Sequence, residues 1–484
     1  MPTPYFPAFR SRLASLGRRT TQTIRQATLA QLQEHLRDFL PAPLLSTEDE
    51  GLNSRERIFS LRLTFECFIW QMLQPKTSCR EVVRQVQALF RLHDQGPVEA
   101  GDSAYVQARQ RLPKERLEKA LAATAQAADR RINPGGHLQG RTVKVVDCST
   151  TQLPDTAANQ QCYPQPGGQK PGCGFPVMKF LVLFSLASGA VLTVVMAGWR
   201  NHDLRLFRRV WDQLKAGDIS LGDRAFGDYV TLASLPRQGV DVVARLHQNR
   251  KADFRRAKRL AKHDGLFVWT KGWQQSNILS IREWSQLPGQ ITVRLLRFTA
   301  TIRGHRARRI TLVTTLLDAK LYPAEELMAL YCRRWRLELC LRDLKTTMGM
   351  EPLRCHSPAM AQKELLAYLV AHNLMRCVMV QAAAQYEVDL ERVSFKGTVD
   401  ALRQYSNAIG QARNRKRRHQ LWEDLLLNLA RDLVPLRPNR REPRAVKHRP
   451  KPYPLLNQPR HRFVEISHRS DYWKGRPRNY RRLN

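Results

Sequence analysis

The stretch "RTVKVVD", residues 141–147, is the first β-rich run in the chain, and the predicted sheet begins with it. It follows a long helix-rich region and the Gly- and Pro-containing "NPGGHLQG", and its Val residues are typical of a β-strand. The composition predicts a strand that ends at Asp147, followed by a polar loop from Thr150 to Gly174. An acid at the end of a strand stands where the chain leaves the sheet. Asp147 is therefore a candidate site residue.

The next apolar stretch, Phe175 to Trp199, is long enough to cross a bilayer. Lys179 and the small residues of the central "SLASGA" argue against a membrane span. Two β-branched and aromatic runs, separated by Ser188 and Gly189, instead predict a buried β-hairpin. No membrane partner is expected.

Strand and helix patterns alternate after this hairpin. Helices are predicted at 203–214 and 228–235, and strands at 218–223, 240–246 and 309–317. The first of these strands ends in Asp223. The order β-β-β-α-β-α-β with mixed pairing predicts an α/β fold with a ribonuclease-H-like mixed sheet. Residues 248–308 are basic and less regular, and they are predicted to form a β-rich insertion in this core.

The region before the sheet is predicted to be a helical N-terminal DNA-binding domain, residues 1–140. One helix is expected at "TSCREVVRQVQALF", where Ser78 and Glu81 have the spacing of a capping box. A second helix, "SAYVQARQRL", follows at 103–112. The two helices fit a helix-turn-helix-like DNA reader and a plain helical bundle equally well.

The catalytic core is predicted to span residues 141–385, interrupted by the insertion. Its last element, "KELLAYLVAHNLMRCVMVQAAAQ" at 363–385, is expected to be a largely buried helix. Residues 386–484 are predicted to be a helical, basic C-terminal region that includes "ARNRKRRHQ". Its Pro- and Arg-rich end is expected to be an extended tail.

The charge balance points to a polyanionic partner. The 484 residues contain 80 Lys and Arg against 42 Asp and Glu, a net charge of +38. Nucleic acid is the first candidate for such a partner. The 9 cysteines lack CxxC spacing, which indicates neither a disulfide framework nor a zinc site and fits a reducing cytoplasm. This length predicts two to four domains.

A second informative stretch is "YCRRWRLELCLRDLK", residues 331–345. It contains no Pro or Gly and is predicted to be one continuous helix. At 100° per residue, Tyr331, Arg334, Glu338 and Lys345 fall within an arc of roughly 60°. The neighbouring arc, which is expected to be buried, carries Leu330, Leu337, Leu341 and Leu344. The simplest alternative is an exposed helix with an Arg334–Glu338 pair.

Asp147, Asp223 and Glu338 form a carboxylate set able to hold two hard cations. Phosphodiester cleavage uses such a set, with two metals roughly 3.5 to 4 Å apart. Mg²⁺ prefers carboxylate oxygens and retains water ligands, so three acids suffice when the phosphate supplies the rest. Simpler roles remain open, because Asp223 could cap the next turn and Asp147 could form an Asx-turn.

Three blocks resemble the catalytic blocks of the DDE transposases of the insertion-sequence-4 group. They are "RTVKVVDCSTTQLPDT" at 141–156, "LGDRAFGDY" at 221–229 and the stretch at 331–345. The phrases "FPVMKFLVLFSLASGAVL" and "AHNLMRCVM" are also similar to family sequence. The resemblance extends over most of the chain and is weakest in the insertion.

The last block matches the family signature Tyr-x2-Arg-x3-Glu-x6-Lys without gaps, at Tyr331, Arg334, Glu338 and Lys345. One residue departs from the family pattern: Cys148 follows the first acid, where the family often has Gly.

The resemblance implies a role for each matched residue. Asp147, Asp223 and Glu338 would be the catalytic acids and the ligands of Mg²⁺, for which Mn²⁺ can substitute. Tyr331, Arg334 and Lys345 would hold DNA phosphates near the transposon end, where Arg334 offers a bidentate fork.

The expected function is cut-and-paste DNA transposition in a prokaryotic cytoplasm, in association with the nucleoid. The enzyme would bind the terminal inverted repeats of its own element, pair them as a homodimer, hydrolyse the end phosphodiester and join the freed 3′-hydroxyl to target DNA. Two alternatives are a catalytically silent repeat-end binding protein and a structure-specific nuclease on the same fold.

Overall fold

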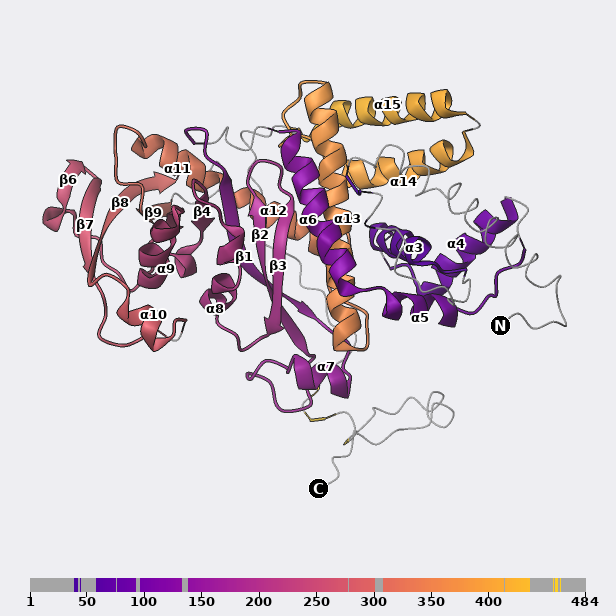
Figure 1. Ribbon diagram of the computed structural model, residues 1–484, viewed down its shortest axis with the longest axis horizontal. Helices are drawn as coiled ribbons and strands as arrows, with labels where there is room; N and C mark the ends of the chain where they lie inside the picture. The colour runs from indigo at the N-terminus through magenta and orange to yellow at the C-terminus, as the bar shows by residue number, and fades with distance from the viewer. Residues whose placement is uncertain are drawn as a thin grey trace, which may run out of the picture.

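The computed structural model describes residues 39–41, 44, 58–74, 76–92, 96–132, 138–276, 278–300, 308–412, 414–435, 456, 458–459 and 462. The predicted C-terminal tail lies almost entirely outside these residues. The described part is a mixed sheet with helices on both faces (Figure 1), so the predicted α/β class is confirmed.

One nine-stranded sheet, in the order β3-β2-β1-β4-β5-β9-β8-β7-β6, runs through the described residues. The strands are β1 (Val143–Gln152), β2 (Val177–Ser185), β3 (Val191–Gly198), β4 (Ile219–Gly222), β5 (Asp241–Arg245), β6 (Lys258–Ala261), β7 (Asp264–Thr270), β8 (Gln290–Ala300) and β9 (Arg308–Thr314). β1 pairs antiparallel with β2 and parallel with β4, and β4 pairs parallel with β5. The predicted hairpin is confirmed as β2 and β3, which are joined at Gly189.

Successive residues of the central strands pack on opposite faces of the sheet, as strand geometry requires. Val145 and Leu221 belong to a core under one layer of helices, whereas Val146 belongs to a second core on the opposite face. The helices are α3 (Leu61–Leu73), α4 (Cys79–Leu92), α5 (Ser103–Arg111), α6 (Lys114–Arg130), α7 (Ala157–Cys162), α8 (Asp203–Arg208), α9 (Tyr229–Ser234), α10 (Ile281–Ser285), α11 (Ala324–Arg333), α12 (Trp335–Arg342), α13 (Pro358–Gln385), α14 (Phe395–Gln411) and α15 (Arg415–Arg431).

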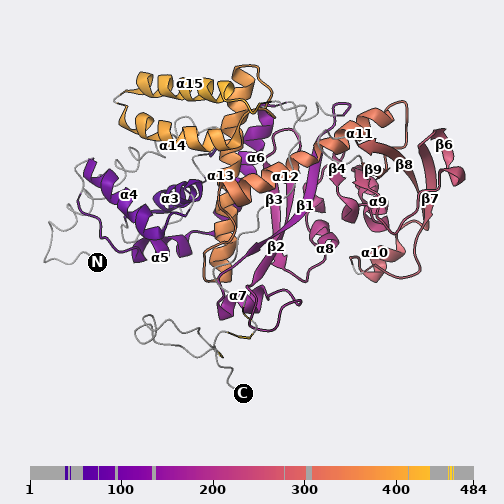
Figure 2. The same cartoon turned by 180° about the vertical axis from the view of Figure 1, so that it is seen from behind.

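The first core joins the sheet to α6, α11, α12 and α13, and the second joins it to α8 and α9. α13 and α6 lie side by side next to β3 in both views (Figures 1 and 2). The predicted burial of α13 is confirmed. By length and composition α13 could cross a membrane, but 89% of its apolar window is buried inside the protein, as in the core helix of a folded domain.

The predicted end of the first strand is wrong. β1 continues past Asp147 to Gln152, because antiparallel pairing with β2 extends from Lys144 to Gln152. Helix α7 also occupies part of the predicted loop. The helix predicted at 203–214 is likewise shorter, because α8 ends at Arg208 and only a short 3₁₀ turn follows.

The segment predicted as an insertion contributes β6, β7 and β8, which extend the same sheet beyond β9. A buried ion pair between Arg294 and Asp264, with Nη2 and Oδ2 2.6 Å apart, joins β8 to β7. Arg294 also donates to the carbonyl oxygen of Tyr322 at 2.7 Å. The segment is therefore continuous with the central sheet.

The N-terminal helices confirm two local predictions. Ser78 and Glu81 form the expected reciprocal bonds at the start of α4, with Glu81 N donating to Ser78 Oγ at 3.2 Å. The second predicted helix is α5. The last helix before the sheet, α6, packs against both β3 and α13 and shares the core of the sheet.

Candidate active site

Strand register brings two of the candidate acids to neighbouring positions. Val145 of β1 is paired with Leu221 of β4 in the parallel ladder. Two residues further along each strand stand Asp147 and Asp223, which by alternation lie on the same face as that pair. β4 ends at Gly222 while β1 continues, so the sheet opens between the two strands at this level.

Asp147 is partly buried and lies near Asp223, Glu338 and Arg334. The pKa of Asp147 is raised to about 6, mainly by burial; the guanidinium of Arg334 lowers this pKa, and the negative charges of Asp223 and Glu338 raise it. The backbone N–H of Cys148 donates to Asp147 Oδ1 at 2.8 Å, which also favours the carboxylate. The two other acids and Arg334 are therefore close enough to act on Asp147 electrostatically.

Asp223 caps the short 3₁₀ turn that follows β4. Its Oδ1 accepts a hydrogen bond from Ala225 N at 2.8 Å. The simpler role considered for Asp223 is thus present. Capping uses one carboxylate oxygen and is compatible with a second role for the other.

The predicted continuous helix at 331–345 is wrong. α11 ends at Arg333, and α12 starts at Trp335. At the junction, Arg334 N donates to Tyr331 O and Leu337 N donates to Arg334 O, so the chain tightens into i→i+3 bonds. After α12 the chain widens into a π-helical turn, Asp343–Thr347. The prediction for the apolar arc is nevertheless confirmed, because the four leucines, Leu330, Leu337, Leu341 and Leu344, are buried.

The structure groups three of the four signature residues. Tyr331 is 7% exposed, and the Arg334 guanidinium lies 5.7 Å from its ring centroid. Arg334 Nη2 is 3.1 Å from Glu338 Oε1. Lys345 lies apart in the π-helical turn, where its Nζ is 3.1 Å from Glu351 Oε2. Both cations thus have carboxylate partners.

Comparison with known proteins gives a match over the region that contains these residues. Residues 138–374 match the family model of the transposase DDE domain. The chain is 26% identical over 425 residues to transposase InsG for insertion sequence element IS4 of Escherichia coli (strain K12). The aligned region covers 87% of this chain and 93% of that protein. The central region therefore matches a transposase DDE domain, and most of the chain is similar to a transposase of an insertion sequence.

Among solved structures, the piggyBac transposase synaptic complex with hairpin DNA is similar with a TM-score of 0.39 and 9% identity. The similarity covers 85% of each chain.

One further residue, Arg245, occupies the same level of the sheet. Gly222 of β4 pairs with Ala244 of β5, so Arg245 is the lateral neighbour of Asp223. Burial raises the pKa of the Tyr331 phenol. The positive charges of Arg334 and Arg245 lower this pKa, and the negative charge of Asp223 raises it. Arg245 therefore lies close to the phenol. The sequence analysis did not select Arg245. The signal was a cation at the end of an otherwise apolar strand, "VDVVAR".

The donor chemistry of this site suits a hard divalent cation. The candidate ligands are carboxylates, and Asp147 is influenced by the negative charges of two more acids. Within the part of the chain that the structure describes, no three acidic, His or Cys side chains are close enough to hold a metal ion. Glu338 instead pairs with Arg334, so a three-acid site requires Glu338 to exchange partners.

Proposed function

We propose that this protein is a DDE transposase that carries out cut-and-paste transposition of its own insertion sequence in the bacterial cytoplasm. It binds the terminal inverted repeats, cleaves the end phosphodiester and transfers the 3′ end to target DNA. The observation that carries the proposal is the lateral alignment of Asp147 and Asp223 beside the helix that bears Glu338. The strand order, with antiparallel β3-β2-β1 followed by parallel β4 and β5, supports a ribonuclease-H-like core.

Asp147, Asp223 and Glu338 are the proposed ligands of Mg²⁺, or of Mn²⁺ in its place. Bound metal would activate the attacking oxygen and stabilise the leaving oxygen of the phosphodiester. The pKa of Asp147 is raised in the metal-free protein, which means that its carboxylate form is disfavoured there. A bound cation would favour that carboxylate form and so lower the pKa.

The cations of the signature are proposed to hold DNA phosphates. Arg334 lies beside Tyr331 and pairs with Glu338, so a phosphate that takes the guanidinium also releases the glutamate. Assembly of the acid set would then follow DNA binding. Lys345 would contact the strand further along, after exchanging its partner Glu351.

The N-terminal helices α3 to α5 are proposed to read the repeat sequence, and a homodimer is proposed to pair the two ends. α6 is packed against α13 and β3, so truncation of residues 1–140 would uncover the core of the sheet. The sequence-reading role is therefore better tested by substitution of exposed α4 cations. Arg80→Ala with Arg84→Ala should reduce the preference for repeat ends over random duplex and leave cleavage at saturating DNA unchanged.

The experiment that tests the reaction uses a labelled repeat-end duplex, a target plasmid and Mg²⁺. Asp147→Ala, Asp223→Ala and Glu338→Ala should each bind the duplex nearly normally and yield neither cleaved nor joined product. Asp212→Ala, an exposed acid beside α8, serves as the control and should retain activity. Near-normal cleavage by any one of the three acid variants removes that residue from the ligand set.

The same assay separates the proposal from its alternatives. A repeat-end binding protein without catalysis forms the complex and gives no cleaved product with the wild-type chain. A structure-specific nuclease cleaves the duplex and gives no joined plasmid.

The phosphate-holding role is tested with Arg334→Ala and Lys345→Ala. Charge-assisted contacts contribute about 1.5 to 3 kcal/mol each, so each variant should form roughly ten- to a hundredfold less paired-end complex at limiting DNA. Both variants should cleave at saturating DNA. Glu351→Gln is the control that removes the Lys345 ion pair and leaves the lysine. Full activity of both cation variants at limiting DNA would leave only a surface ion-pair role for these residues.

A further inference from the structure

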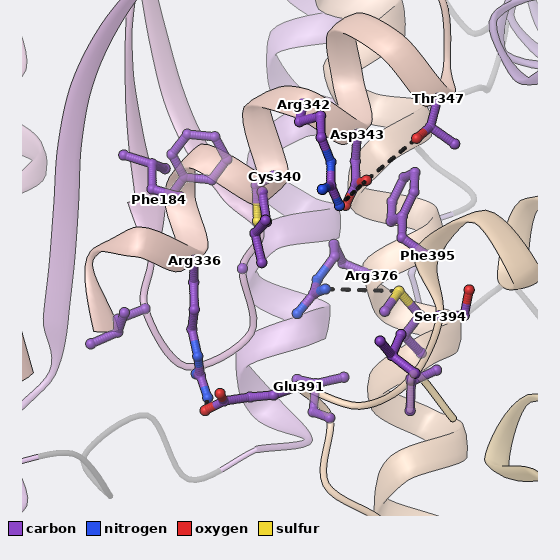
Figure 3. A pocket seen from close by; sticks show the side chains of 18 of the residues that line it. Phe184, Arg336, Cys340, Arg342, Asp343, Thr347, Arg376, Glu391, Ser394 and Phe395 are labelled. Atoms are coloured by element: carbon purple, nitrogen blue, oxygen red, sulfur yellow. Dashed lines mark hydrogen bonds and ion pairs between the residues drawn. The ribbon is translucent and has the colours of Figure 1, made fainter. Parts of the chain in front are cut away.

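A cavity of about 390 Å³ lies between α12, α13 and the start of α14 (Figure 3). Arg336 lines this cavity, and it is two residues before Glu338, which corresponds to about 200° around the helix. Residues of α13 and of the segment that leads into α14 form the opposite wall, and Phe184 of β2 contributes to the base. Sites for small ligands typically occupy roughly 300 to 1,000 Å³.

Positive charge predominates in this cavity. Its ionisable lining consists of Arg336, Arg342, Arg376 and Lys396, with Asp343 and Glu391, so four cations face two carboxylates. The remaining walls are largely apolar, with Leu337, Phe184 and Phe395 among them. An anion with an apolar body matches this combination of side chains.

Arg376 is a cation that two hydrogen-bond contacts hold in place at the edge of the cavity. Its Nε donates to the carbonyl oxygen of Ser188 at 2.6 Å, and its Nη1 lies 3.8 Å from the thioether sulfur of Met379. The turn at Gly189 lies against the guanidinium, since a Cβ there would come within 2.8 Å of it. Among the described residues, no carboxylate forms an ion pair with Arg376. Its charge therefore remains available to an anion in the cavity.

Arg336, on α12, has incomplete hydrogen bonding. It forms an ion pair with Glu391, but its buried Nε has no acceptor in the described structure. An anion beside Arg336 would supply the acceptor that this Nε lacks.

We propose that this cavity binds a nucleoside monophosphate unit. The phosphate lies between Arg336 and Arg376, where planar guanidinium groups can donate paired hydrogen bonds, and the base and sugar lie against the apolar wall at Leu337 and Phe395. The unit can be a free nucleotide or an unpaired terminal nucleotide of DNA. Because Arg336 and Glu338 share α12, occupation of the cavity is expected to restrict the movement of the helix that carries the third candidate acid.

The test is equilibrium binding of deoxyadenosine 5′-monophosphate to the full chain by calorimetry in EDTA. Measurement without metal keeps this result independent of the proposed reaction. Deoxyadenosine, which lacks the phosphate, should bind at least tenfold more weakly, and inorganic phosphate should also bind more weakly than the nucleotide. Equal binding of deoxyadenosine and its monophosphate, or no measurable binding of the monophosphate, overturns the proposal.

Variants locate the binding site. Arg336→Gln and Arg376→Gln should each weaken binding of the monophosphate at least tenfold, whereas Lys416→Gln, an exposed cation on α15, should not change it. Thermal unfolding of each variant checks that it is folded. If Arg376→Gln unfolds, Lys396→Gln is used in its place. Lys396 also lines the cavity, but it does not contact Ser188 as Arg376 does. Unchanged affinity in the folded cavity variants overturns the assignment.

A competition arm identifies the source of the nucleotide. A duplex with one unpaired 5′-phosphorylated nucleotide displaces the monophosphate if the cavity takes DNA ends. A blunt duplex of the same sequence serves as the control. Failure of both duplexes to compete supports a free nucleotide as the ligand.

Discussion

Three charged residues stand at equivalent positions on three adjacent parallel strands. Asp147, Asp223 and Arg245 each lie two residues beyond the paired row formed by Val145, Leu221 and the β5 residue aligned with it. Lateral pairing therefore places two acids and a cation in one row beneath α11 and α12. Each charge is close to Tyr331 or to Arg334, as their effects on neighbouring pKa values show.

Arg245 is predicted to help position the scissile phosphate. Arg245→Gln keeps a polar side chain but removes the charge, and it should lower paired-end complex formation by about tenfold, since a charge-assisted bond contributes roughly 1.5 to 3 kcal/mol. Arg200→Gln, an exposed cation after β3, is the control. Gel-shift titration with repeat-end duplex measures the effect, and Arg245→Lys should restore part of it. A wild-type titration curve for Arg245→Gln would assign Arg245 a structural role only.

The pKa of Asp147 predicts a pH-dependent contribution to stability. Its folded-state pKa is raised from the ordinary 3.8 to about 6, so the folded chain holds this proton more tightly than the unfolded chain. The stabilising contribution is fully present below about pH 4 and is lost as the pH rises through 6. The loss corresponds to about 3 kcal/mol.

Asp147→Asn removes this titration while the amide oxygen can still accept from Cys148 N. The variant and the wild type should have similar free energies of unfolding at pH 4. At pH 7.5 the variant should be more stable by about 2 to 3 kcal/mol. Urea unfolding of the metal-free proteins at both pH values measures the difference. An identical difference at the two pH values would contradict the raised pKa.

Two irregular elements, the junction between α11 and α12 and the π-helical turn after α12, set the positions of the charged signature residues. The junction at Arg334 and the π-helical turn after α12 change the angular phase that a regular helix would give to the signature residues. Tyr331, Arg334 and Glu338 stay together, whereas Lys345 faces Glu351. π-Helical turns occur frequently at functional sites, where they redirect side chains.

The β2–β3 turn is predicted to be sensitive to a single methyl group. Gly189 has a φ of +71°, and an added Cβ would come within 2.8 Å of the Arg376 guanidinium. That guanidinium is held by the Ser188 carbonyl, so it cannot move away without loss of a hydrogen bond. Gly189→Ala should reduce the free energy of unfolding by roughly 2 to 3 kcal/mol.

Gly217→Ala is the matched control. Gly217 has a φ of +92° with no atom within 4 Å of an added Cβ, so this substitution measures the backbone cost alone, about 1 kcal/mol. Denaturant titration of both variants gives the difference. Equal costs for the two substitutions would show that the contact with Arg376 adds no constraint.

The whole molecule combines one continuous sheet with a net charge of +38. The segment from β6 to β8 prolongs the sheet on one side, and α6 and α13 flank it on the other (Figure 2). The sheet therefore connects the strands that carry the candidate acids to both flanking regions. An extended duplex is the partner that such a charge would bind most strongly.

Binding of duplex DNA is predicted to depend steeply on salt. Each phosphate that a Lys or Arg neutralises releases counterions, so the logarithm of the binding constant should fall linearly with the logarithm of salt concentration. With roughly 6 to 10 phosphate contacts, affinity should drop about 10³- to 10⁵-fold between 50 and 200 mM salt. Fluorescence anisotropy with random duplex measures the slope. A slope near zero would rule out the phosphate backbone as the main partner of these charges.

Local sequence determined the parts of this protein that depend on neighbouring residues. Alternating β-branched residues specified the strands, the Ser188-Gly189 pair specified the hairpin turn, and Ser78 with Glu81 specified the start of α4. The apolar arc around Leu337 was also readable, because burial follows helical periodicity. Asp147 and Asp223 were selected from predicted strand ends, and Glu338 was selected from the family signature.

Tertiary pairing decided the rest. Asp147 is inside β1 because β2 continues to pair beyond it, and Arg245 reaches the site because β5 is in register with β4. The segment from 258 to 300 joins the sheet because β9 offers an edge for β8. The helix breaks at Arg334, where Tyr331 and Leu337 are both buried on either side of the junction. These features depend on hydrogen bonds and packing between residues far apart in the chain, which local periodicity does not contain.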